Sequence, residues 1–168
     1  MPTVSPGTCR FQGKRHVLAS PPGHRRFQGV NGSKAMNEPY IRAGEAGIDF
    51  YYLFSLFDFE DLPIVFVCRD DSQNLYLCNC TEFRFETQEW TIASTDESTI
   101  NDVAEGRKSV YDALAAGSAL LATYTYADET YQQEAVAFAD IPETRLPDRD
   151  SRITISNQEK ERILNYAI

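Results

Sequence analysis

Hydrophobic residues gather in short runs along most of the chain, and turn-forming residues separate the runs. Residues 50–59 form the most apolar stretch and are rich in aromatic side chains, which favour β-strands. Residues 63–68 and 75–80 are two further apolar runs on either side of a polar loop at 69–74, an arrangement typical of a hairpin. Neither run alternates between apolar and polar positions. We therefore expect strands that are covered on both faces of the sheet.

A further strand and two short helices are predicted next. The apolar run at 89–93 indicates the strand. Ser94 and Glu97 have the spacing of a capping box, in which the two residues satisfy the free backbone amides at the start of a helix. Ser109 and Asp112 form a second box of the same type. Two short helices are therefore expected between the fourth and fifth strands.

The rest of the pattern predicts one more hairpin and a C-terminal helix. Residues 120–126 and 134–138 flank a polar turn at 128–130, and Ser156 with Glu159 forms a third capping box. The predicted fold is therefore α+β. It is a small curled antiparallel sheet or open barrel of about six strands, with two short helices inserted between strands four and five and a helix at the C-terminus.

Length and composition are those of one folded domain. The chain has 168 residues, of which 42% are hydrophobic and 12% aromatic, and the aromatic share is too high for a disordered chain. The sequence contains no run of eighteen apolar residues and no apolar segment of the kind that begins a secretory signal. We therefore expect no membrane association and a cytoplasmic location.

Charge divides the chain into two parts. Residues 1–45 carry seven Lys and Arg against two Glu, a net charge of about +5. Because the whole chain has a net charge of −9, residues 46–168 carry about −14. We predict a disordered basic arm at 1–45 and a single acidic α+β domain at 46–168. Two origins of the arm stay open. It is either a native tail that binds nucleic acid or, if the native chain begins at Met36, a vector-derived or over-extended segment at 1–35.

The acidic domain has few residues of catalytic type. Both histidines, His16 and His24, lie in the predicted arm, so the domain has no imidazole to act as a general base or zinc ligand. The sequence also has no glycine-rich phosphate loop and no nucleophile elbow. We predict no catalytic residue, no bound metal and no cofactor, and whether the protein is an enzyme stays open.

Three cysteines lie on the first predicted hairpin. If Cys68 pairs with Tyr76, then Phe66 lies opposite Cys78, and Cys68, Cys78 and Cys80 share one face of the sheet. Their spacing is not that of a structural zinc site. Buried, reduced cysteines are therefore the favoured interpretation, and a metal or redox role is the alternative.

Acidic residues cluster in the predicted turns, and the connection after Cys80 is unusually rich in aromatic residues. We predict that these two groups contact a partner, and their members are Asp58, Glu60, Asp61, Asp70, Asp71, Phe83 and Phe85. A strongly acidic surface attracts basic proteins and repels phosphate, so we expect a basic protein partner and no nucleic acid on the domain itself. The predicted function is a non-catalytic interaction module, like an antitoxin, immunity protein or inhibitor. The alternative is a metal-dependent enzyme in which the acidic turns converge.

The first hairpin, the tryptophan that follows it and the entry to the second helix form a combination that spans residues 48–115. Its members are Pro63, Phe66, Cys68, Asp70, Asn74, Tyr76, Trp90, Gly106, Ser109, Asp112 and Ala113. In this combination the chain resembles an uncharacterised family of small bacterial domains of unknown function. The resemblance implies a bacterial or phage-borne, cytoplasmic α+β domain and brings no assigned activity.

Overall fold

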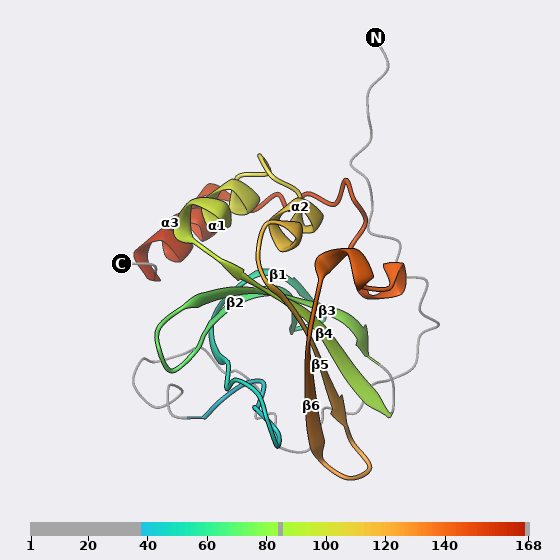
Figure 1. The fold of residues 1–168 in the computed structure, drawn as a ribbon. Helices are drawn as coiled ribbons and strands as arrows, with labels where there is room; N and C mark the ends of the chain where they lie inside the picture. The colour runs from blue at the N-terminus through green and yellow to red at the C-terminus, as the bar shows by residue number, and fades with distance from the viewer. Residues whose placement is uncertain (1–37, 84–85, 167–168) are drawn as a thin grey trace.

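Six antiparallel strands follow one another across a single curled sheet in the computed structural model, which describes residues 38–83 and 86–166 (Figure 1). In chain order the strands are β1 (Tyr51–Phe59), β2 (Leu62–Arg69), β3 (Leu75–Phe83), β4 (Thr87–Thr95), β5 (Ala119–Thr125) and β6 (Thr130–Val136). Each strand pairs with its neighbour in the sequence, so β1 and β6 are the two edges and the sheet is open.

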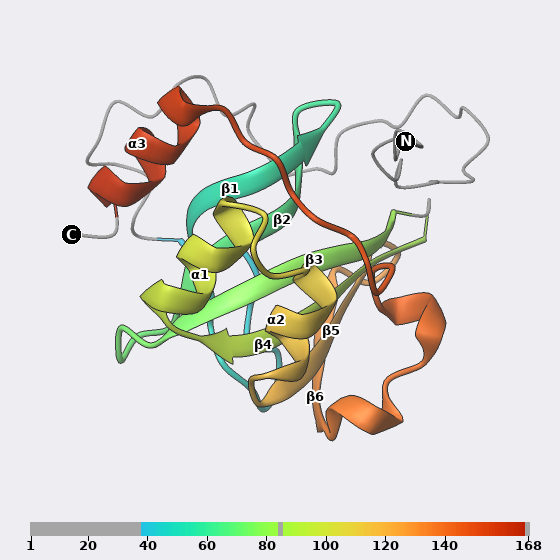
Figure 2. The same ribbon diagram turned by 90° about the horizontal axis from the view of Figure 1, so that it is seen from above.

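The helices lie together on one side of the sheet, as Figures 1 and 2 show. Helices α1 (Glu97–Ala104) and α2 (Val110–Ala115) connect β4 to β5. Two 3-10 turns, η2 (Phe138–Asp140) and η3 (Glu143–Arg145), follow β6, and α3 (Asn157–Tyr166) ends the described chain. This is the α+β architecture that the hydrophobic pattern predicts, with two helices between strands four and five and one helix at the C-terminus.

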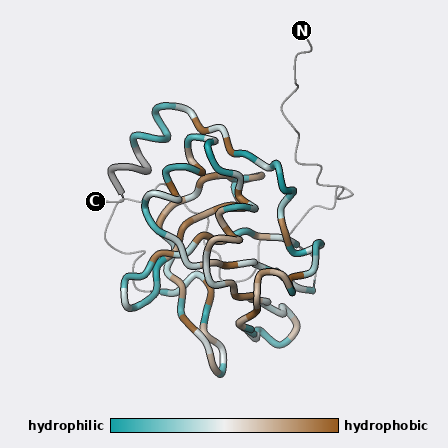
Figure 3. The backbone as a smooth tube through the Cα atoms, turned by 45° about the horizontal axis from the view of Figure 1, so that its top comes forward, coloured by the Kyte–Doolittle hydropathy of each residue, from teal (hydrophilic) through white to brown (hydrophobic). Residues whose placement is uncertain are grey.

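The convex face of the sheet and helices α1 and α2 bury a shared hydrophobic core. Val67, Leu77, Ala93 and Ala119 form one row across β2 to β5, and all four are buried. The two helices add the buried side chains Ile100, Val103, Ala104, Val110, Ala113 and Leu114. Figure 3 shows the same division, with hydrophobic residues along the central strands and hydrophilic residues at the outer turns.

Hydrogen bonds of Arg145 hold turn η3 against the middle of this face. The Thr91 hydroxyl donates a hydrogen bond of 2.6 Å to the backbone carbonyl of Arg145. The Arg145 guanidinium in turn donates to the carbonyls of Trp90, at 3.2 Å, and Ala122, at 3.1 Å. The chain after β6 is thereby held against β4 and β5.

The concave face is filled by aromatic rings and by the segment before β1. The Tyr40 ring lies 5.2 Å from the ring of Phe66, and the Phe50 ring lies 4.9 Å from that of Tyr76. Ile41 is fully buried and pairs with Phe50 in an isolated bridge. Both faces of the sheet are therefore covered, as the lack of alternation in the strands predicts.

This packing corrects the predicted boundary of the basic arm. The sequence pattern places residues 38–45 in the arm, yet Ile41 is part of the core and Tyr40 packs against it. The error arises because two core residues among polar neighbours produce no hydrophobic period. Residues 1–37, which make up the rest of the predicted arm, lie outside the described part of the chain.

The segment before β1 also reaches across to the other edge of the sheet. The Gln133 side chain on β6 donates hydrogen bonds to the carbonyls of Arg42, at 2.8 Å, and Ile48, at 2.7 Å, and accepts one from the Ile48 amide. At Gly44, an added Cβ would lie only 2.3 Å from the carbonyl oxygen of Tyr131. Glycine therefore permits the close approach through which this segment spans the gap between β6 and β1.

The predicted capping box at Ser156 is confirmed, and Ser109 is confirmed as the N-cap of α2. The Ser109 hydroxyl accepts a hydrogen bond of 3.0 Å from the amide of Asp112 at the start of α2. At the start of α3, the Ser156 amide donates to the Glu159 carboxylate at 2.9 Å, and the Glu159 amide donates back to the Ser156 hydroxyl at 3.3 Å.

The predicted box at Ser94 is wrong. Strand β4 continues to Thr95, and α1 is capped by Asp96, whose carboxylate accepts a hydrogen bond of 2.7 Å from the Thr99 amide. The Ser94 hydroxyl instead accepts from the amide of Ser118, where β5 begins. Pairing along β4 thus moves the helix start by two residues.

The second hairpin also differs from its predicted bounds. The predicted strand at 134–138 begins earlier in the structure, at Thr130, and ends at Val136, before Phe138 enters η2. The mostly exposed residues of β6 explain the difference, because an edge strand with polar side chains lacks the hydrophobic signal of a buried strand.

Candidate functional site

The order of the strands sorts the acidic turns to opposite ends of the sheet. In an antiparallel meander, successive turns alternate between the two ends. The β1–β2 turn at 60–61 and the β5–β6 turn at 126–129 therefore lie at one end, and the β2–β3 turn at 70–74 lies at the other. Strand β2 has eight residues between its two turns, so the two ends are about 25 Å apart.

The predicted partner residues consequently form two groups. Asp58, Glu60 and Asp61 lie at one end of β2, whereas Asp70 and Asp71 lie at the other. A metal held jointly by both groups would need all ligands within one coordination sphere, which this separation does not allow. Within residues 38–83 and 86–166, no three His, Cys, Asp or Glu residues are arranged to hold a metal ion.

The end of the first hairpin, residues 57–61, carries exposed aromatic and acidic side chains, and we call it the β1–β2 tip. The Phe57 side chain is 37% exposed and the Phe59 side chain 49%. Residues 57, 58 and 59 pair with Val65, Pro63 and Leu62, and the register shifts on both sides of Phe57. The Ser55 hydroxyl contacts the Asp58 carboxylate within this irregular part of β1.

The turn within the β1–β2 tip has an unusual backbone. Glu60 and Asp61 have φ values of +50° and +65°, which form the two-residue turn that matches the twist of a hairpin. This left-handed conformation favours Gly, Asn and Asp, and it costs about 1 kcal/mol for most other residues. The strain at the apex therefore falls mainly on Glu60.

The β1–β2 tip extends beyond the part of β2 that pairs with β3. The β2–β3 register ends at Val65 and Asn79, whereas β1 and β2 stay paired as far as Phe59 and Leu62. Figure 2 shows this hairpin diverging from β3 and β4. Below it, Pro63 and Ile64 are buried. The tip is therefore a projecting two-stranded ribbon on a packed base.

Asp70, in contrast, forms hydrogen bonds within its own turn. Its carboxylate accepts hydrogen bonds from the Asn74 amide at 2.9 Å, the Asn74 side chain at 2.8 Å and the Tyr76 hydroxyl at 3.0 Å, and the residue is buried. Burial alone would raise the pKa of Asp70, but these hydrogen bonds outweigh it and lower the pKa below its ordinary value. The neighbouring Asp71 is exposed.

The two predicted phenylalanine contacts cannot be placed in full. Phe83 is the last residue of β3 and pairs with Gln88, which puts it at the same end of the sheet as the β1–β2 tip. Its side chain and all of Phe85 lie outside the described part of the chain. The exposed aromatic residues that the structure describes are Phe57 and Phe59, which the sequence analysis assigns to a strand. The alternation of Phe57, Asp58, Phe59 and Glu60 is the signal that could have identified them.

The three cysteines occupy one face, in the predicted register. Cys68 pairs with Tyr76 and Phe66 with Cys78, and all three thiols are buried. Burial raises the pKa of Cys68 well above its ordinary value and raises the pKa of Cys80 to about 12. Both thiols are therefore neutral at pH 7 and shielded from solvent, which makes them poor nucleophiles.

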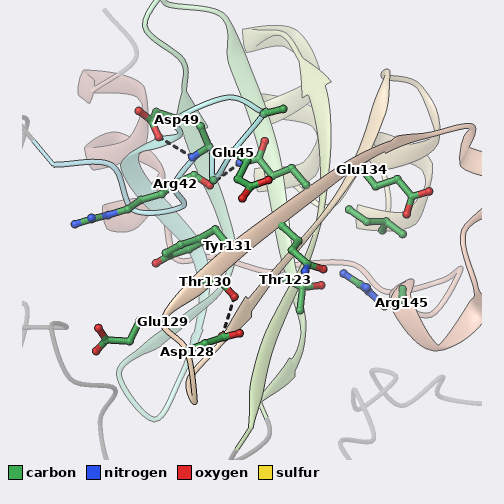
Figure 4. Close-up of a pocket in the computed structure, with 16 residues that line it drawn as sticks. Arg42, Glu45, Asp49, Thr123, Asp128, Glu129, Thr130, Tyr131, Glu134 and Arg145 are labelled. Atoms are coloured by element: carbon green, nitrogen blue, oxygen red, sulfur yellow. Dashed lines mark hydrogen bonds between the residues drawn. The ribbon is translucent and has the colours of Figure 1, made fainter.

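A recess beside β6 brings together charged residues from distant parts of the sequence (Figure 4). Three of the charged side chains are bound within the protein. Asp49 accepts a hydrogen bond of 2.7 Å from the Ala43 amide, Asp128 accepts one of 2.8 Å from Thr130, and Arg145 holds η3 as described above. The recess is therefore the seam where the segment before β1 meets β6.

Comparisons with protein-family models, with curated proteins and with solved structures find no match for this chain. The resemblance to an uncharacterised bacterial family therefore stays a prediction. None of the helices in the described ranges combines the length and the apolar character needed to cross a membrane.

Proposed function

We propose that the protein is a non-catalytic interaction module whose partner is a basic protein. It would be a small acidic bacterial or phage protein that acts in the cytoplasm like an antitoxin, immunity protein or inhibitor. One observation carries the proposal. Five exposed carboxylates lie at one end of the sheet, and within the described ranges none has a cationic partner: Asp58, Glu60, Asp61, Asp128 and Glu129.

Charge at one end of a protein acts on a partner in two ways. Carboxylates without a cationic partner steer a basic protein during encounter and repel wrong partners of the same sign. Screening limits their direct reach to about 8 Å at physiological salt. The carboxylates at this end should therefore matter more for binding than equally exposed carboxylates at the far end.

A fluorescent nona-arginine peptide tests this local effect on the full chain. Reversing two charges at the tip, with Glu60→Lys and Asp61→Lys, should weaken binding about tenfold. The matched control, Asp71→Lys with Glu97→Lys, changes the net charge by the same amount at the opposite end and should weaken binding less than about threefold. Fluorescence anisotropy at 50 and 150 mM salt gives the dissociation constants. Equal losses for the two variants would show that only net charge matters and would reject the proposal.

The two alternative functions lack a specific observation in their favour. The metal-dependent enzyme required the acidic turns to converge, and β2 keeps them about 25 Å apart. A nucleic-acid role depends on the basic arm, most of which lies outside the described residues.

A further inference from the structure

We infer that the open edge of β6 binds an extended basic segment of the partner, which pairs with β6 as an added strand. This inference rests on the proposed function and specifies how the basic protein binds. It joins three features of β6: backbone groups that face away from the sheet, a recess beside them and carboxylates around the recess.

The direction of the backbone groups in β5 follows from two hydrogen bonds at its ends. The Tyr126 amide donates to the Glu86 carbonyl, next to the start of β4. At the other end, the Ser118 carbonyl accepts from the amide of Ser94 on β4. Backbone groups alternate in direction along a strand, and the pairing of β5 has no register shift. Even-numbered residues of β5 therefore face β4, and odd-numbered residues face β6.

The same alternation gives β6 an unpaired edge. Gln132 pairs with Thr123, an odd-numbered residue of β5, so even-numbered residues of β6 face β5. Gln133 and Ala135 therefore direct their amides and carbonyls away from the sheet. Within the described ranges, neither residue makes a backbone hydrogen bond on that side.

The two edges of the sheet differ in how they are protected. Natural edge strands avoid pairing with other chains through bulges, lysine or proline. The edge strand β1 has three register shifts, whereas β6 has no register shift, no lysine and no proline. Strand β6 is therefore the edge that can accept another strand.

The recess beside β6 lies along this edge. Its volume is about 980 Å³, and five consecutive residues, Thr130–Glu134, line it (Figure 4). Successive side chains of a strand point to opposite faces, so a recess that touches all five lies at the edge. Gly44 lies against the carbonyl of Tyr131, so the stretch open to an added strand begins at Gln133.

Charge determines which segment fits. Arg42 is the exposed cation among the lining residues, because Arg145 is partly buried and pairs with Glu89. Four exposed carboxylates line the same recess: Glu45, Asp128, Glu129 and Glu134. A segment that carries Lys or Arg complements them. A second copy fits poorly, since pairing β6 with β6 brings two sets of these carboxylates together.

A random dodecapeptide library displayed on phage and selected against the full chain supplies the probes. Selected peptides should alternate Lys or Arg with β-branched or aromatic residues, the pattern of an added strand. When a synthesised peptide binds, hydrogen exchange measured by NMR should slow at least about tenfold at the Gln133 and Ala135 amides. The amides of Gln132 and Glu134 face β5 and are the internal control.

The variant Ala135→Pro tests backbone pairing without changing charge. Proline removes an outward amide, which an edge strand tolerates, and should weaken binding of the selected peptides at least about fivefold. The matched control Ala135→Ser keeps the amide and should change affinity less than about twofold. Circular dichroism checks that each variant keeps its fold, and the exchange measurement on the wild type does not depend on either variant.

Four results would overturn the inference. The first is a selection with no enriched sequence, and the second is a bound peptide that leaves exchange at Gln133 and Ala135 unchanged. The third is slow exchange of both amides in the free chain, which would mean that another part of the same chain already pairs with β6. The fourth is a dimer in sedimentation velocity that Ala135→Pro abolishes, which would make a second copy the occupant.

The nona-arginine measurement separates these failures from failure of the proposed function. If the tip charge reversal still weakens nona-arginine binding more than its control, the acidic module stands and only strand addition at β6 is rejected.

Discussion

The two turns that flank β2 have similar compositions and different structures. The turn at 60–61 and the turn at 70–74 each contain two adjacent acidic residues. At the first turn both acidic residues are exposed and have left-handed φ values, whereas at the second Asp70 is buried and accepts three hydrogen bonds. The comparison shows that an acidic turn becomes a candidate binding surface only when its own backbone leaves the carboxylates unused.

Turn length explains the difference. The longer turn lets the Asp70 carboxylate reach the amide of Asn74 four residues later, and Gln73 adopts a left-handed φ of +69° that closes the turn. In the two-residue turn, Glu60 and Asp61 are exposed. The charge of Asp70 in the longer turn stabilises the folded protein, whereas the charges of Glu60 and Asp61 in the shorter turn face solvent.

The largest effect is expected from Asp70→Ala. The substitution removes the acceptor of three hydrogen bonds and leaves donors of Asn74 and Tyr76 without a partner in a part-buried site. We expect a loss of about 3 kcal/mol in the free energy of unfolding, measured by urea denaturation. Asp71→Ala, one residue away and exposed, should change it by less than about 0.5 kcal/mol. Similar losses for the two variants would mean that the hydrogen bonds of Asp70 do not stabilise its turn.

A smaller effect is expected from pH. The pKa of Asp70 is lowered in the folded protein, so its ionised form contributes stability above the unfolded-state pKa of about 3.9. This contribution is lost as the pH falls through the lower, folded-state pKa. The gap in unfolding free energy between wild type and Asp70→Asn should be about 1.5 kcal/mol at pH 7 and should shrink by more than half near pH 2.5. A gap that stays constant between these pH values would contradict the role of the charge.

The fold could be predicted because its local signals agree with its packing. The helix caps at Ser109 and Ser156 and the register of Cys68 against Tyr76 follow from short-range rules, and the structure confirms them. Ser94 was misassigned because strand pairing extended β4 past the cap motif. The segment containing Ile41 was missed because its partner on β6, Gln133, is 85 to 91 positions away and only the curl of the sheet brings the two near.

The candidate site was predicted only in part. Asp58, Glu60 and Asp61 could be found as an acidic turn, but exposure of Phe57 and Phe59 depends on where pairing between β2 and β3 stops. That point is set by tertiary packing and leaves no mark on the strand sequence. For the same reason, Asp70 and Asp71 could not be separated from the tip residues by composition, because their distance depends on the topology of the sheet.

The smallest effect is expected from relieving the strain at the tip. Glu60→Asn with Asp61→Gly introduces the pair that a two-residue hairpin turn prefers and should raise the free energy of unfolding by about 1 kcal/mol. The same change removes two carboxylates from the apex, so binding of nona-arginine should weaken. Thermal denaturation and fluorescence anisotropy measure the two effects on one variant. A more stable protein that binds less well would mean that the acidic apex is kept at the expense of stability, as expected where strain serves a binding site. Unchanged stability would show that the backbone at 60–61 is not strained. The two turns would then differ only in the hydrogen bonds of Asp70.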